Sequence, residues 1–224
     1  MMWRATPKRR AAVGRALLVG ACLLAASHSS DAAAPEPVLW DLLRGGGQVV
    51  LMRHGVTFPE TSEPPGARVD DCSTQRNLSA AGREEARRVG AALKAHGVPV
   101  GKVLSSRWCR CLETARLAFG RAEPWPDLEF AGWKDTPEKR RRERALRDFL
   151  GTLPQPGALD PGNRAQDYRA QANPAPANTV LVSHGFVIEP LVGSSPRPAE
   201  FFVLTPQPGG GFRVAGRLAP DPLD

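Results

Sequence analysis

Three short, largely apolar segments constrain the fold of this 224-residue chain more than any other feature. They cover residues 48–52, 100–104 and 179–182, and each has the pattern of a strand buried on both faces of a parallel sheet. Helical patterns lie between them, at residues 79–97, 107–119 and 136–150. This order predicts an α/β fold with a mostly parallel central sheet and helices on both faces.

Helix boundaries and loops complete the expected domain. Ser79 and Thr136 are predicted to begin two of the helices as N-caps, and Gly97 to end the first of them. Short helices are expected at 38–43 and 186–192, and a terminal pair of strands at 201–204 and 212–215. Residues 56–76, 121–135 and 153–178 are rich in Pro, Gly and polar residues and are predicted loops. We therefore expect a single domain over residues 34–224.

Residues 1–33 have the pattern of a secretory signal peptide. Basic residues come first, an apolar stretch at 16–26 follows, and small residues close the segment. Cleavage is expected after Ala32 or Ala33. The apolar stretch is too short to span a bilayer, so we expect a periplasmic or secreted protein without stable membrane insertion in its mature form. Lipidation of Cys22 is the competing interpretation, because residues 19–22 resemble a bacterial lipobox.

The formal net charge of +7 would suit a nucleic-acid partner, but its distribution does not. Without residues 1–33 the chain has 25 basic and 22 acidic residues, a net charge of only +3. The basic run 139–142 is flanked by Glu138 and Glu143, a pattern typical of a solvated helix face. No nucleic-acid partner is expected.

Reactive side chains follow all three predicted strands. Arg53 and His54 follow the first, a serine pair and then Arg110 follow the second, and His184 follows the third. The carboxyl ends of parallel strands meet at one edge, where α/β folds bind ligands. Arginine pairs with phosphate oxygens, and a histidine nitrogen can attack phosphorus. A structural role is the alternative for a strand-end histidine, and we expect it for His96, which lies near the end of a helix.

Four segments of the chain, 51–55, 77–83, 105–115 and 180–185, resemble motifs of the histidine phosphatase superfamily, in its phosphoglycerate-mutase-like branch 1. The resemblance covers roughly residues 48–204 and implies the phosphoglycerate-mutase-like fold. It also implies that His54 is the nucleophile and forms a phosphohistidine, while Arg53, Arg110 and His184 bind the phosphoryl group. The substrate would be a small phosphorylated molecule, and no metal or cofactor is expected.

The sequence specifies the proton donor and the reaction class less closely than it specifies the nucleophile and the phosphoryl-binding residues. The family's proton-donating segment, laid on residues 125–133, places Asp127 at the acid, and Glu129 is the alternative two residues away. Both carboxylates could instead be exposed loop residues without a role. A phosphatase acting on a phosphomonoester, with a sugar phosphate as one candidate, is the favoured function. A phosphomutase and a phosphoryl-binding domain without turnover are the alternatives.

Three cysteines remain after the signal segment: Cys72, Cys109 and Cys111. In an oxidising compartment one pair is expected to close. Cys109 and Cys111 are two residues apart on a predicted helix and point in different directions, so Cys72 is predicted to pair with one of them. A zinc site is disfavoured, because no fourth ligand has suitable spacing.

Overall fold

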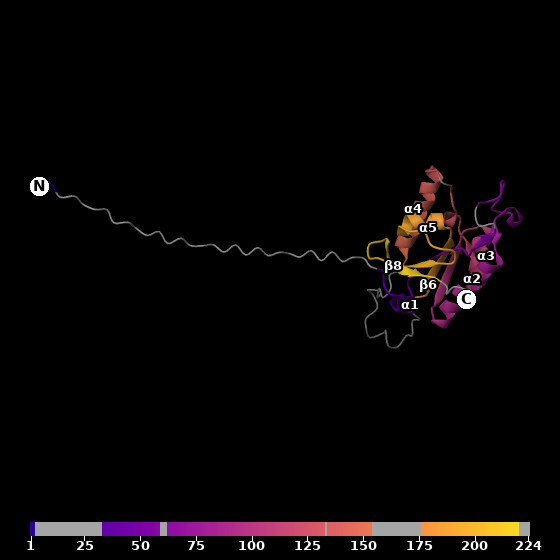
Figure 1. The fold of residues 1–224 in the computed structure, drawn as a ribbon, viewed down its shortest axis with the longest axis horizontal. Coiled ribbons are helices and arrows are strands. Elements are labelled where there is room, and N and C mark those ends of the chain that lie inside the picture. The colour runs from indigo at the N-terminus through magenta and orange to yellow at the C-terminus, as the bar shows by residue number, and fades with distance from the viewer. Residues whose placement is uncertain (3–32, 59–61, 133, 154–175, 220–224) are drawn as a thin grey trace. The chain divides into compact units, whose positions relative to one another are not determined.

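The computed structural model describes residues 1–2, 33–58, 62–132, 134–153 and 176–219 (Figure 1). The helices and strands below all lie in the compact unit Ala33–Asp224. The expected signal segment, including Cys22, lies outside the described residues except for its first two residues and Ala33. The same holds for Trp133 and for nearly all of the predicted loop 153–178. Over the described ranges, no helix is long and apolar enough to cross a membrane.

Six strands form the main sheet in the order β5-β4-β6-β1-β7-β8. Strands β5, β4, β6 and β1 run parallel, and the terminal pair β7–β8 is antiparallel, so the predicted mostly parallel sheet is confirmed. Their bounds are β1 Val49–Arg53, β4 Val100–Ser105, β5 Glu123–Pro124, β6 Asn178–Ser183, β7 Phe201–Pro206 and β8 Phe212–Leu218.

Short elements that local sequence did not indicate lie in two of the predicted loops or directly after them. Strands β2 (Thr57–Phe58) and β3 (Asn77–Leu78) pair with each other, and a 3-10 helix, η1 (Cys72–Thr74), lies between them. Strand β5 and a second 3-10 helix, η2 (Pro126–Leu128), lie in the predicted loop 121–135. Each of these elements has only two or three residues, which is too few to show a period along the chain.

In the part of the chain that the structure describes, five helices cover the two faces of the sheet, as predicted (Figure 1). Side chains that alternate along β1 enter two separate cores. Val50 and Met52 pack with residues of α1, α2 and α3, whereas Val49 and Leu51 pack with residues of α4 and α5. The helices are α1 Glu36–Gly45, α2 Ala80–Ala95, α3 Cys109–Phe119, α4 Pro137–Thr152 and α5 Gly185–Val192.

The helix starts follow the expected capping chemistry. The Ser79 hydroxyl accepts a hydrogen bond from the Gly82 amide at 3.0 Å, and Thr136 accepts one from the Lys139 amide at 3.1 Å. Helix α3 begins at Cys109, two residues later than the predicted start at 107, because Trp108 has a non-helical ψ of 133°.

Candidate active site

The parallel register brings the two strand-end histidines together. Arg53 lies opposite Ser183 in the β1–β6 pairing, and the His54 amide donates to the Ser183 carbonyl at 3.0 Å. The rings of His54 and His184 are therefore 5.5 Å apart, centroid to centroid. Arg110 extends from the first turn of α3 and donates to Nδ1 of His184 at 3.3 Å. The structure thus gathers the four predicted pocket residues at the carboxyl edge of the sheet.

The environment of His54 leaves one ring nitrogen available as a nucleophile. The ring is 3% exposed, and its Nδ1 lies 2.7 Å from the Gly55 carbonyl oxygen. A carbonyl can only accept, so Nδ1 carries the proton and Nε2 keeps its lone pair. Burial, together with the charge of Arg110, lowers the pKa of His54 well below its ordinary value. At neutral pH the ring is uncharged.

His184 is also buried and neutral. Because Arg110 donates to its Nδ1, the proton of His184 resides on Nε2, which donates to the Ser106 hydroxyl at 2.9 Å. Burial first, and Arg110 second, lower the pKa of His184 well below its usual range. Among the described residues, the positive charge near the two rings therefore comes from arginines. Both rings lie near guanidinium groups, which favour the neutral form of each histidine.

Arg53 and Arg110 each have one donor that the described residues leave unpaired. The Nε atoms of both side chains are buried and have no hydrogen-bond partner among the described residues. Buried donors of this kind are rare and call for a functional explanation. Burial lowers the pKa of both guanidinium groups from their usual values, yet arginine remains charged in proteins. These two donors suit the oxygens of a phosphoryl group.

Arg76 is a third pocket arginine, which the sequence analysis missed. Its charge lowers the pKa of His54 and of His184, so it lies within electrostatic reach of both rings. Its side chain is 13% exposed. Its position could have indicated this role, because Arg76 directly precedes residues 77–83, one of the four segments that resemble motifs of the histidine phosphatase superfamily.

Two helices hold the turn that carries His54. The Gly55 amide donates to the Thr114 hydroxyl of α3 at 3.1 Å, and the Val56 amide donates to the Glu85 carboxylate of α2 at 2.8 Å. A Cβ atom at Gly55 would lie 2.5 Å from the carbonyl oxygen of Gly82, which real contacts do not allow. The start of α2 therefore packs directly on the turn, and glycine is required there.

Neither expected proton donor bonds to the four pocket residues. Asp127 forms an ion pair with Arg141 at 2.8 Å. Glu129 is 6% exposed and is paired with Arg107 and with Arg142, the latter at 3.1 Å. Within the described residues, no hydrogen bond or ion pair joins Asp127 or Glu129 to the pocket.

The three cysteines of the compact unit form one bridge and leave one thiol. Cys72 of η1 and Cys109 of α3 form a disulfide with a Cα–Cα distance of 5.7 Å, which selects one of the two predicted pairings. Cys111 is buried, with its sulfur 3.6 Å from Nε2 of His184. Burial raises the pKa of Cys111 to about 12, so the thiol stays protonated.

Residues 49–195 match the family model of the histidine phosphatase superfamily, branch 1, and the chain belongs to this superfamily. Among solved structures it is similar to the protein histidine phosphatase SixA complexed with tungstate, with 19% identity, a TM-score of 0.48, and coverage of 77% of this chain and 97% of that chain. It is similar to mycobacterial hydrolase 2 at 15% identity, with a TM-score of 0.52 and coverage of 79% and 92%.

A third similar structure is a phosphoglycerate mutase from Thermus thermophilus, with 24% identity, a TM-score of 0.44, and coverage of 78% of this chain and 99% of that chain. At these identities the likeness concerns the fold alone. No curated protein sequence matches the chain.

Proposed function

We propose that the protein is a phosphatase that hydrolyses a small phosphomonoester through a phosphohistidine on His54. The observation that carries the proposal is the state of the His54 ring. Its Nδ1 proton is bound to the Gly55 carbonyl, which leaves the lone pair on Nε2, and burial together with nearby arginines keeps the ring neutral. A neutral imidazole beside fixed cations is suited to attack a phosphoryl dianion.

The first step transfers the phosphoryl group to the enzyme. The Nε2 lone pair of His54 forms a bond to phosphorus, and the bond from phosphorus to the leaving oxygen breaks. Arg53 and Arg110 bind the phosphoryl oxygens, and His184 joins them when its Nε2 proton turns from the Ser106 hydroxyl to an oxygen of the substrate. The Gly55 carbonyl stabilises the positive charge that the His54 ring gains. In the second step water attacks phosphorus and releases phosphate. A carboxylic acid protonates the leaving oxygen in the first step, a role that the sequence assigns to Asp127 or Glu129.

The export expected from residues 1–33 would favour hydrolysis over the mutase alternative, because phosphomutase substrates of central metabolism are cytoplasmic. We infer that residues 1–33 are removed and that the protein acts in the periplasm or outside the cell. The amide of Ala34 donates to the Ala215 carbonyl of β8 at 2.8 Å, so the compact unit includes the residue that directly follows the expected cleavage sites. The disulfide fits an oxidising compartment.

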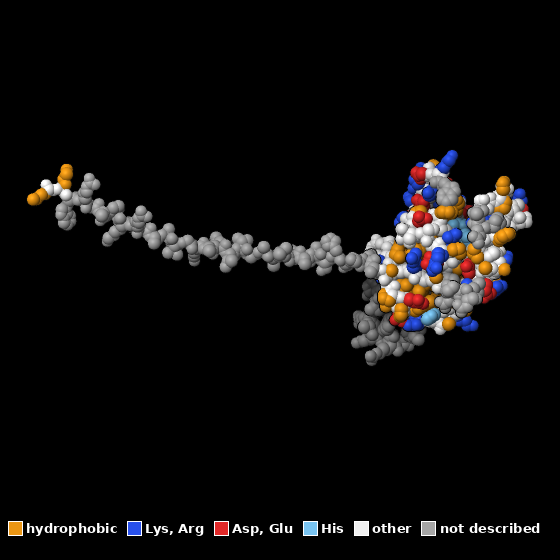
Figure 2. All heavy atoms as spheres, viewed as in Figure 1, with side chains coloured by type: hydrophobic (Ala, Val, Ile, Leu, Met, Phe, Trp, Pro, Cys, Tyr) orange, Lys and Arg blue, Asp and Glu red, His pale blue; other side chains and the backbone are white. Residues whose placement is uncertain are grey.

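A polyanionic partner is not part of the proposal. On the face shown in Figure 2, basic and acidic side chains are interspersed rather than segregated. Along α4, Arg141 and Arg142 are both paired with Glu138, at 2.9 Å and 2.7 Å. The basic run 139–142 therefore lies on a solvated helix face with its charge largely compensated.

The test is release of phosphate and trapping of the intermediate. The mature protein should release nitrophenol and phosphate from nitrophenyl phosphate, and brief incubation should leave a phosphoryl group on His54 that is stable to base and labile to acid. His54→Ala should abolish both. His96→Gln, which changes a histidine that stacks on Trp40 away from the pocket, is the matched control. A phosphoenzyme still formed by His54→Ala would refute the mechanism, and ligand binding without turnover would favour the binding-domain alternative.

A further inference from the structure

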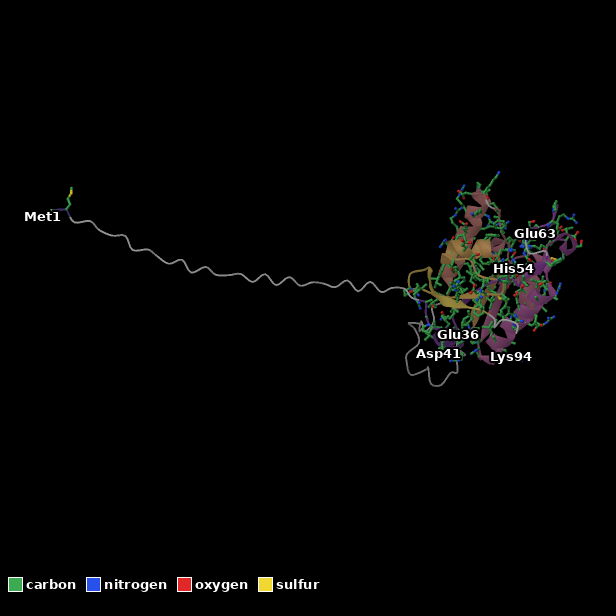
Figure 3. All side chains as sticks on the ribbon, viewed as in Figure 1. Met1, Glu36, Asp41, His54, Glu63 and Lys94 are labelled. Atoms are coloured by element: carbon green, nitrogen blue, oxygen red, sulfur yellow. A yellow bond between two sulfur atoms is a disulfide. The ribbon has the colours of Figure 1, made fainter. Side chains whose placement is uncertain are left out.

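A carboxylate that no motif indicated lies among the pocket arginines. Glu63 belongs to the segment between β2 and η1, and its Oε1 is 2.5 Å from Nη1 of Arg110. The same oxygen is 3.7 Å from Nε of Arg76, whose backbone amide donates to the other carboxylate oxygen at 3.0 Å. In Figure 3 Glu63 and His54 are labelled at the same end of the domain. Glu63 thus contacts the guanidinium group to which the proposed function assigns phosphoryl binding.

The exposure of Glu63 suits a group that meets the departing part of a substrate. Its side chain is 28% exposed, whereas that of Arg110 is 5% exposed. The Glu63 side chain is therefore more open to solvent than Arg110, although its Oε1 atom is itself buried, and it lies beside the donor to which the proposed function assigns phosphoryl binding. Within the described residues, no hydrogen bond or ion pair joins Asp127 or Glu129 to Arg110, and each of the two carboxylates is ion-paired with other arginines.

We propose that Glu63 is the proton donor and acceptor of the reaction, in place of Asp127 and Glu129; this assignment rests on the phosphatase function proposed above. In the free protein the Glu63 carboxylate is an ion-pair partner of the Arg110 guanidinium group. A phosphoryl group that takes Arg110 as its partner therefore lies beside the Glu63 carboxyl group, close enough for a proton to pass between that group and the leaving oxygen.

Each bond and each proton of the two steps has a source and a destination. As Nε2 of His54 bonds to phosphorus, the bond to the leaving oxygen breaks, its electron pair moves to that oxygen, and the Glu63 carboxyl supplies the proton. The resulting Glu63 carboxylate next accepts a proton from water as the water oxygen bonds to phosphorus. The nitrogen–phosphorus bond breaks, and its electron pair returns to His54. Glu63 ends the cycle protonated until phosphate leaves, when its ion pair with Arg110 forms again.

The segment that carries Glu63 is held against α3 immediately before Arg110. The disulfide joins Cys72 to Cys109, the neighbour of Arg110. The Cys109 amide also donates to Oε1 of Gln75 at 2.9 Å, and Nε2 of Gln75 donates to the Arg68 carbonyl at 2.7 Å. These contacts fix the path of residues 68–75 and so limit where Glu63 can reach.

The experiment compares Glu63→Gln with the wild type on two esters that differ in their need for an acid. Nitrophenolate leaves without protonation, whereas the alkoxide of glycerol phosphate does not. Glu63→Gln should lower kcat/KM for glycerol phosphate by about 10²–10⁴-fold and leave kcat/KM for nitrophenyl phosphate within a few fold. Because its second step lacks a base, the variant should also release a burst of nitrophenol stoichiometric with enzyme, which shows at the same time that it is folded.

Three variants complete the design. Asp127→Asn and Glu129→Gln should affect both esters alike, and Glu113→Gln, which removes an ion pair with Arg83 on the surface, is the matched control. Glu63→Asp should recover part of the lost activity toward glycerol phosphate.

Several results would overturn the assignment. A gain in kcat/KM for both esters in Glu63→Gln would show that Glu63 competes with the phosphoryl group for Arg110. An equal loss for both would show that it only orients Arg110, and a selective loss in Asp127→Asn or Glu129→Gln would move the acid there. A wild type that hydrolyses neither ester and forms no phosphoenzyme would refute the phosphatase itself, and with it this role of Glu63.

Discussion

The bridge between Cys72 and Cys109 allows a quantitative prediction. It closes a loop of 37 residues, which contains β3, the whole of α2 and β4. In the chain-entropy treatment, a loop of this length removes roughly 4 kcal/mol of conformational freedom from the unfolded state at 25 °C. The double variant Cys72→Ser/Cys109→Ser should therefore have a free energy of unfolding about 3–4 kcal/mol lower than the unreduced wild type.

Urea denaturation followed by far-ultraviolet circular dichroism measures this difference. Cys111→Ala keeps the bridge and controls for the loss of a thiol. Thiol titration supplies an independent check, because the unreduced mature protein should contain one free thiol, Cys111, that reacts only after unfolding. Three free thiols without reductant would refute the bridge. A change in unfolding free energy below about 1 kcal/mol would show that the loop-closure reasoning does not apply here.

Three further predictions concern the pocket and the N-terminus. Arg110→Ala should lower kcat toward nitrophenyl phosphate by about 10²–10³-fold, since it removes a preorganised donor to the transition state; a loss below tenfold would contradict this. Burial holds the pKa of His54 and of His184 in the folded protein below about 6.5, the ordinary value of histidine. As pH falls below that value, the unfolded chain therefore binds more protons than the folded protein. The free energy of unfolding should then drop by up to about 1.4 kcal/mol per pH unit for each ring. In urea titrations at several pH values, His184→Gln should make the fall of unfolding free energy with pH shallower. An unchanged dependence on pH would contradict the role of His184 in it. N-terminal sequencing of the exported protein should begin at Ala33 or Ala34, whereas lipid labelling at Cys22 would indicate an anchored form.

Much of the pocket followed from local sequence. Continuous apolar segments indicated β1, β4 and β6, and the parallel order of strands and helices predicted that their carboxyl ends share one edge. Arg53, His54 and His184 lie immediately at those ends, so placing the strands also placed these side chains. Arg110 could be located equally well because it lies one short connection away, in the first turn of the following helix.

The residues that tertiary structure alone revealed lie in segments without periodicity. Residues 62–76 follow a path set by side-chain hydrogen bonds to the backbone, such as those of Gln75, and by a covalent cross-link. None of these leaves a repeating pattern in the sequence. Glu63 and Arg76 reach Arg110 only because that path folds back over α3, and a motif laid along residues 125–133 could not detect a carboxylate that comes from a distant loop.

The choice between the two possible disulfides was likewise decided in three dimensions. From sequence, Cys109 and Cys111 differed only in their direction from the predicted helix. Once α3 packs on the sheet, the side of the helix that bears Cys111 faces β6 and His184 and is buried, while Cys109, at the first helical residue, faces η1. Apolar periodicity thus determined the strands and the edge where the chemistry gathers. The identity of the disulfide and the carboxylate beside Arg110 depended on how an aperiodic loop packs against that edge, which only the folded chain specifies.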